Sequence, residues 1–145
     1  MKGIKISIIT LFIIVFVLII MLLNAGPPKP IVLSGNNKIT IVQGSYCWKK
    51  ITGTECVDKI SPPEILDNNK IVPFSVSPQS KIKINFKKQP EKVEVEKWMN
   101  NDESEKVIVE DNSISVPNEK GKYIYIISGR WDKGSSSYIF SIKVK

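Results

Sequence analysis

The chain contains no histidine among its 145 residues. This absence excludes nucleophilic sites of the Ser-His and Cys-His kind, and it removes the commonest zinc ligand and the only side chain that normally titrates near neutral pH. The single Ser-x-x-Lys match, Ser80 to Lys83, lies in a strand-like alternating pattern, whereas that catalytic pair requires a helix. We therefore predict that the protein is not an enzyme.

Charged residues are absent from one long segment, residues 6–23 (ISIITLFIIVFVLIIMLL), in which only Ser7 and Thr10 are polar. As an α-helix this run would be about 27 Å long, close to the hydrocarbon thickness of a bilayer. We predict that residues 1–24 form a signal-anchor transmembrane helix. Because Lys2 and Lys5 precede the run, the positive-inside rule predicts a single-pass protein of the cell membrane, with a cytoplasmic N-terminus and an extracellular C-terminal domain.

A cleaved signal peptide is the alternative to this anchor, since it also begins with basic residues before an apolar run. Its apolar region is usually about 7–15 residues long, and only Ala25 resembles the small residue of a cleavage site. The longer run favours the uncleaved anchor over cleavage near Ala25. No cysteine directly follows the run, which excludes the lipid-modified cysteine of a bacterial lipoprotein.

Cysteine is scarce, and the two that are present, Cys47 and Cys56, flank a predicted four-residue loop at 50–53. This arrangement places them opposite each other on two strands, within disulfide range, and closing so short a loop would contribute roughly 2–3 kcal/mol. Their spacing fits neither a C-x-x-C redox motif nor tetrahedral zinc. The acidic stretch 100–105 lacks the spacing and glycine of an EF-hand. We predict a disulfide, and neither a metal nor a cofactor.

Proline-rich residues 25–37 are predicted to form a stiff linker that lifts the following domain off the membrane. Residues 38–145 are sufficient for one domain with its own core. The clearest strand in it is 81–87, where apolar residues alternate with the outward-facing Lys81, Lys83 and Lys87.

Further strands are predicted at residues 38–43, 45–50, 55–59, 70–76, 93–98, 106–110, 113–116, 122–128 and 138–144. Two prolines exclude 61–66 from a central strand, so we expect a crossover or edge segment there with Ile65 and Leu66 buried. Short strands joined by tight turns predict an all-β fold, an antiparallel immunoglobulin-like β-sandwich. Tyr123 stands where such a fold has its tyrosine corner, unless this side chain simply packs in the core.

The formal net charge is +7, and all 14 acidic residues follow the apolar run. A basic domain beside a membrane favours anionic lipid headgroups or an anionic wall polymer, although a merely solvated surface would look the same. The possible binding surfaces are of two kinds, a lysine-rich strand face and a set of aromatic rings that could stack on sugars unless they belong to the core: Lys81, Lys83 and Lys87; Trp48, Trp98 and Trp131 with Tyr46 and Tyr138.

Several motifs resemble those of a group of short, largely uncharacterised membrane-anchored or secreted proteins of low-GC Gram-positive bacteria. They are the stretches 44–48 (GSYCW), 56–58 (CVD), 62–66 (PPEIL), 121–125 (GKYIY) and 134–140 (GSSSYIF), with Trp131 between the last two. The resemblance implies an extracytoplasmic compartment and a small β-sandwich. It transfers no catalytic residue to this chain.

These observations predict a non-catalytic, membrane-anchored extracytoplasmic binding module for a protein or an anionic envelope component. A carbohydrate-binding module is the alternative, and a small hydrolase is the less favoured one. Nucleic acid is not expected as a partner, because it is in the wrong compartment and the lysines do not cluster with aromatic residues as in a strand-binding groove.

Overall fold

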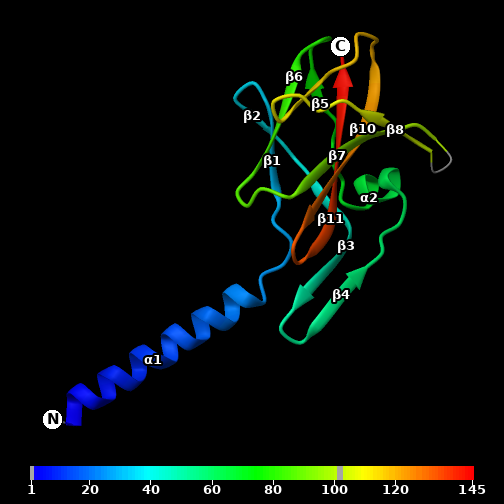
Figure 1. Cartoon of the computed structure of the whole chain (residues 1–145). Coiled ribbons are helices and arrows are strands. Elements are labelled where there is room, and N and C mark those ends of the chain that lie inside the picture. Colours follow the sequence, from blue (N-terminus) through cyan, green and yellow to red (C-terminus); the bar gives the residue numbers. More distant parts are fainter. Residues whose placement is uncertain (1, 101–102) are drawn as a thin grey trace.

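In the computed structural model of the chain, the backbone is described for residues 2–100 and 103–145, and side chains are described from residue 8 onward. A long N-terminal helix, α1 (Lys2–Leu23), projects from a body of strands that also holds a short helix, α2 (Pro62–Asn68) (Figure 1). The strands are β1 (Pro30–Ser34), β2 (Asn37–Ile39), β3 (Val42–Lys50), β4 (Gly53–Val57), β5 (Phe74–Val76), β6 (Lys81–Phe86), β7 (Lys92–Trp98), β8 (Ser104–Val107), β9 (Ser113–Ser115), β10 (Gly121–Trp131) and β11 (Gly134–Val144).

The strands form two sheets, as predicted for an all-β sandwich. The smaller sheet has the order β2-β1-β6-β9, and the larger has the order β4-β3-β11-β10-β7-β8. The described pairings are antiparallel except that β5 runs parallel to β11. The core lies between the sheets, where alternate residues of β11 (Tyr138, Phe140, Ile142) and of β6 (Ile82, Ile84) are buried. The period-two pattern of the sequence thus identified the inner face of β6.

The first strand of the domain begins earlier than the sequence indicated. Residues 30–34, placed in the predicted linker, form β1 and pair with β6 at the centre of the smaller sheet. Pro30 is the first residue of this strand, a position where a missing backbone donor is tolerated. The predicted strand 38–43 is divided instead, because the chain passes at residues 40–41 from the smaller sheet to the larger one.

A second apolar cluster lies on the opposite face of the larger sheet, beneath α2. Ile65 and Leu66 are buried there against Ile139, as expected for the crossover, but the segment is a helix, which the sequence analysis did not predict. Its two prolines occupy the first helical turn, where their missing N–H groups cost nothing. Seven residues are too few for a periodic pattern to show in the sequence.

Tyr123 makes the hydrogen bond that a tyrosine corner requires. At the start of β10 its hydroxyl donates to the backbone carbonyl of Glu119, 2.9 Å away. The bond ties the loop before β10 to the strand itself. It accounts for a tyrosine, rather than another aromatic residue, at this position.

The predicted N-terminal helix is present as α1, and its large apolar side chains from Ile8 to Leu23 are exposed. The transmembrane assignment made from the sequence receives no support here. Within the residues that the structure describes, no helix is both long and apolar enough to cross a membrane.

We predict that Ser141→Ala stabilises the domain. Among the described side chains, the Ser141 hydroxyl is the buried polar group without a hydrogen-bond partner. Burying such a group without a partner costs about 1–3 kcal/mol, and alanine removes it without adding volume. Chemical denaturation should show an increased free energy of unfolding, with Ser135→Ala on the exposed part of β11 as the control. A loss of stability in Ser141→Ala would contradict the prediction.

We also predict that the domain loses stability in alkaline solution. Burial raises the pKa of Tyr125 to about 12, and the neighbouring Tyr123 adds to the shift. A raised pKa in the folded state means that the stabilisation is complete below the unfolded pKa near 10 and is lost as the pH rises through 12. The loss is on the order of 2–3 kcal/mol. The midpoint of thermal unfolding should fall above pH 10 in the wild type and less so in Tyr125→Phe.

Candidate functional site

The outer face of the smaller sheet brings together lysines from two strands. Leu33 of β1 pairs with Lys38 of β2 on one side and with Lys83 of β6 on the other, so these three residues form one row across the sheet. Lys81 lies two residues before Lys83 on the same face. From strand geometry the backbones of Lys38 and Lys83 are about 10 Å apart, and those of Lys81 and Lys83 about 7 Å. We call Lys38, Lys81 and Lys83 the lysine face.

The lysine face is not neutralised by carboxylates. The ion pairs among the described residues involve five other lysines, and three of these pairs lie on β7 and β8 of the larger sheet: Lys92–Glu94, Lys106–Glu94 and Lys97–Glu105. The bond from Lys92 holds the pKa of the Glu94 carboxyl below its usual range. All three side chains of the lysine face are exposed. The lysines of β7 and β8 are therefore paired with carboxylates, whereas those of the lysine face are not.

Lys87 does not belong to this face, although the sequence pattern grouped it there. β6 ends at Phe86, which pairs with Pro30, and Lys87 lies beyond it in the loop to β7. This loop is at the end of the sandwich to which α1 is attached (Figure 1). The predicted lysine surface is thus divided between two parts of the molecule.

The candidate sugar-stacking rings are mostly in the core. Trp48 and Trp131 are 2% and 3% exposed and meet edge to face, with ring centroids 5.6 Å apart. Tyr138 is fully buried, and its hydroxyl donates to the backbone carbonyl of Pro28. Trp98 and Tyr46 are half-buried. These aromatic residues do not form a flat exposed platform of the kind that polysaccharide binding would use.

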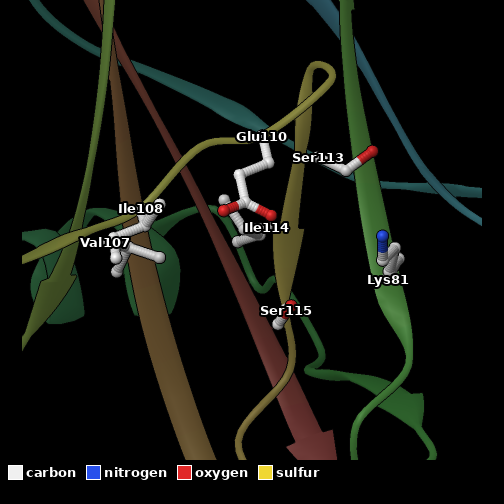
Figure 2. A pocket seen from close by; sticks show the side chains of 7 residues that line it. All are labelled: Lys81, Val107, Ile108, Glu110, Ser113, Ile114 and Ser115. Atoms are coloured by element: carbon white, nitrogen blue, oxygen red, sulfur yellow. The ribbon is translucent and has the colours of Figure 1, made fainter.

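A shallow hollow of about 310 Å³ lies beside the lysine face, between β9 and the segment that follows β8. Figure 2 shows Lys81 from β6, and Glu110 extending toward Ile114 of β9. Ile108 on its rim is 78% exposed. The polar groups that line the hollow are the hydroxyls of Ser113 and Ser115, the ammonium of Lys81 and the carboxylate of Glu110.

The sequence analysis did not identify this hollow, although its turn has a recognisable signal. Asp111 and Asn112 both have positive φ, 48° and 57°, between the bridged residues Glu110 and Ser113. Asp and Asn are favoured in such a hairpin turn because they tolerate the left-handed conformation. The packing of the two sheets decides which residues of this turn lie beside Lys81.

No group of three or more acidic or cysteine side chains within the described residues could hold a metal ion. Two residues of the acidic stretch 100–105, Asn101 and Asp102, lie outside the described residues.

The β3–β4 hairpin carries the predicted disulfide, which is confirmed. Cys47 pairs directly with Cys56, with 4.0 Å between their Cα atoms. The connecting turn has two residues, 51–52, rather than the predicted four, because Lys50 pairs with Gly53. Gly53 has a φ of 134°, a conformation that favours glycine.

Three side chains of the hairpin form a polar network beside Trp48. Glu55 accepts a hydrogen bond from the Tyr46 hydroxyl and forms an ion pair with Lys50 at 2.5 Å. The Lys50 bond, and next the Tyr46 bond, hold the pKa of Glu55 below its usual range. Since these groups are only half-buried and all three are paired, we interpret the network as stabilising the hairpin and not as a reactive site.

The segment after α1 is bound to the domain at three places. The Trp48 indole N–H donates to the carbonyl of Ala25 at 2.9 Å, the Tyr138 hydroxyl to Pro28 at 2.8 Å, and the Lys133 ammonium to Leu23 at 3.3 Å. The sequence analysis predicted a stiff spacer that would lift the domain off the membrane. Two of the three donors are buried aromatic side chains, and they hold the segment against the domain.

We predict that reducing the disulfide lowers the thermal stability of the domain. Opening this short loop should cost about 2.5 kcal/mol, which for a domain of this size corresponds to about 10 °C in the midpoint. The measurement is thermal unfolding with and without reductant, and a Cys47→Ser/Cys56→Ser variant should be insensitive to reductant. Two freely alkylated thiols in protein taken from its native compartment would contradict the pairing.

No family model, no curated protein and no solved structure matches this chain.

Proposed function

We propose that this chain is a non-catalytic, membrane-anchored extracytoplasmic binding module whose lysine face recognises an anionic envelope polymer. The observation that carries the proposal is the group of exposed lysines without carboxylate partners on the smaller sheet, in contrast to strands β7 and β8 of the larger sheet, whose lysines are paired. A row of unbalanced charge on a flat sheet suits an extended polyanion better than a small molecule. The shallow hollow at Lys81 continues the face toward β9.

The buried aromatic residues support this choice over a carbohydrate-binding module. With Trp48, Trp131 and Tyr138 in the core, recognition of sugar rings by stacking has too few exposed partners. Recognition of an anionic polymer by lysine side chains needs no exposed aromatic ring. A basic residue close to an anionic surface contributes about 1 kcal/mol, so three lysines acting together are a substantial attraction at low salt.

We further propose that the sandwich is immunoglobulin-like. Its two long C-terminal strands, β10 and β11, are neighbours, with β7 and β8 following beside β10, while β1, β6 and β9 form the other sheet. This order corresponds to the G-F-C-C′ sheet and its partner sheet in variable-type immunoglobulin domains. The hydrogen bond from Tyr123 to Glu119 supports the same assignment.

Anchoring of α1 in a membrane is the third part of the proposal. Its apolar side chains from Ile8 to Leu23 are exposed. Burying one large apolar side chain contributes about 1.5–3 kcal/mol, and insertion into a bilayer would bury many of these side chains at once. The use of the Ala25 carbonyl by Trp48 favours a chain that keeps this residue over one cleaved after it. A disulfide fits the extracellular side, and the basic residues before the run favour an N-terminus in the cytoplasm.

The anchor predicts that the full chain remains with washed membranes in alkaline carbonate. Protease added to wall-stripped cells should remove the C-terminal domain, while a cytoplasmic marker protein stays intact. A mature chain with an N-terminus near Gly26 in the medium would overturn the anchor and establish cleavage.

The lysine face predicts that the variant Lys38→Gln/Lys81→Gln/Lys83→Gln binds purified anionic wall polymer about 100-fold more weakly at low salt, from about 1 kcal/mol per lysine. The matched control is Lys92→Gln/Lys97→Gln/Lys106→Gln, which removes the same charge from the larger sheet. Binding of the full chain in non-ionic detergent would be measured at two salt concentrations.

Wild-type binding should weaken with salt, and the control variant should bind like the wild type. An equal loss in both variants would show that net charge alone is responsible and would overturn the lysine face as the site. Crosslinking in intact cells that captures an acidic protein through Lys81 or Lys83, with no polymer binding, would replace the polymer by a protein partner.

A further inference from the structure

Three connections gather at the end of the sandwich where α1 is attached (Figure 1). They are the β3–β4 turn at 51–52, the β10–β11 turn at 132–133 and the loop from β6 to β7 that begins with Lys87. The first two meet the helix itself, since a hollow of about 330 Å³ is lined by Leu23 of α1 together with Ile51 and Lys133. The β6–β7 loop meets the β10–β11 turn through the ion pair of Lys88 with Asp132, so the last turn of α1 and all three connections lie at one end of the sandwich.

The junction between helix and domain is held in a fixed geometry. Trp48 and Tyr138 are buried in the core and donate hydrogen bonds to the carbonyls of Ala25 and Pro28, and Lys133 donates to that of Leu23. Hydrogen bonds from side chains locked by packing position the segment more firmly than its prolines alone would do. These bonds oppose free rotation of the domain about the end of α1.

The residues at this level combine an exposed apolar tip with basic neighbours. Ile51, at the tip of the hairpin, is 58% exposed. Lys49 and Lys87 are exposed, and Lys133 lies beside Leu23. An apolar residue flanked by lysines is the pattern of segments that enter the interface of an anionic bilayer.

The acidic residues near this end compensate only part of its charge. Glu55 is paired with Lys50, and Asp132 is paired with Lys88 at 3.0 Å. Glu91 is exposed in the same loop as Lys87. Lys49 and Lys133 make no ion pair among the described residues.

We propose that this end of the domain docks on the bilayer in which α1 is embedded. Ile51 enters the interface, and Lys49, Lys87 and Lys133 contact the phosphates of anionic lipids. The inference rests on the membrane anchoring proposed above, and it adds a second contact, made by the domain itself. The lysine face has no part in it, because β6 carries Lys81 and Lys83 away from the end where Phe86 pairs with Pro30.

The test places an environment-sensitive fluorophore at the hairpin tip of the full chain. Ile51→Cys is labelled with a nitrobenzoxadiazole probe, while the native cysteines remain in their disulfide. The control is Asn118→Cys, an exposed position beside the turn that precedes β10, at the opposite end of the sandwich where Gly121 pairs with Val144. Both proteins are reconstituted into vesicles of phosphatidylcholine alone or mixed with phosphatidylglycerol, and flotation measures membrane attachment.

At position 51 we expect emission shifted to shorter wavelength, with quenching by spin-labelled lipid, and a larger effect with phosphatidylglycerol. Position 118 should show neither. Adding Lys49→Gln/Lys87→Gln/Lys133→Gln should abolish the dependence on phosphatidylglycerol, whereas Lys38→Gln/Lys81→Gln/Lys83→Gln should leave it unchanged.

The possible failures are distinguishable. If the labelled protein floats with the vesicles but positions 51 and 118 give the same spectrum, the docking is overturned and the anchor stands. An equal effect of both lysine triples on the spectrum at position 51 would likewise overturn the assignment to this end of the domain. If the protein does not float, the anchor and the docking are both overturned.

Discussion

The contact between Trp48 and Trp131 is the interaction on which the organisation of the molecule depends. The two rings meet edge to face, and Phe86 packs edge to face on Trp131 with ring centroids 5.4 Å apart. Each such contact contributes about 0.5–1.5 kcal/mol beyond the burial of its area. Both indole N–H groups then donate to backbone carbonyls outside the sheets, that of Trp48 to Ala25 and that of Trp131 to Lys88 at 3.0 Å. One aromatic cluster thus joins the hairpin, the segment after the helix and the β6–β7 loop.

Two glycines make this cluster possible. A Cβ atom on Gly129 would lie 2.5 Å from the Trp131 ring, and one on Gly134 would lie 2.0 Å from the carbonyl oxygen of Cys47. The first glycine leaves space for the ring, and the second lets the start of β11 approach β3 closely. Gly134 also has a φ of 140°, which other residues rarely adopt. The disulfide beside this approach joins β3 to β4 and so fixes the register within the hairpin.

The division of charge between surfaces follows from this architecture. The inner residues of both sheets form the core, so the charged residues face outward. On β7 and β8 these outward residues include both carboxylates and lysines, whereas on β2 and β6 the charged residues are lysines alone. The smaller sheet consequently offers cations without counter-ions. A protein with two tryptophans in its core has little aromatic surface left for sugars, which is why we base recognition on charge.

The N-terminal helix, the all-β architecture of two sheets, the pairing of Cys47 with Cys56 and the inner face of β6 could all be predicted from the sequence. Each of these depends on local pattern, either the absence of charge, alternation of period two or the short spacing of two cysteines. The sequence could not determine that residues 30–34 form a central strand, that residues 62–68 are helical, or that Lys87 is separated from Lys83. Those outcomes depend on contacts between residues far apart in the chain. The alignment of Lys38 with Lys83 across β1, and the hydrogen bond from Trp48 to Ala25, follow from sheet order and sandwich packing, and no local pattern in the sequence encodes either.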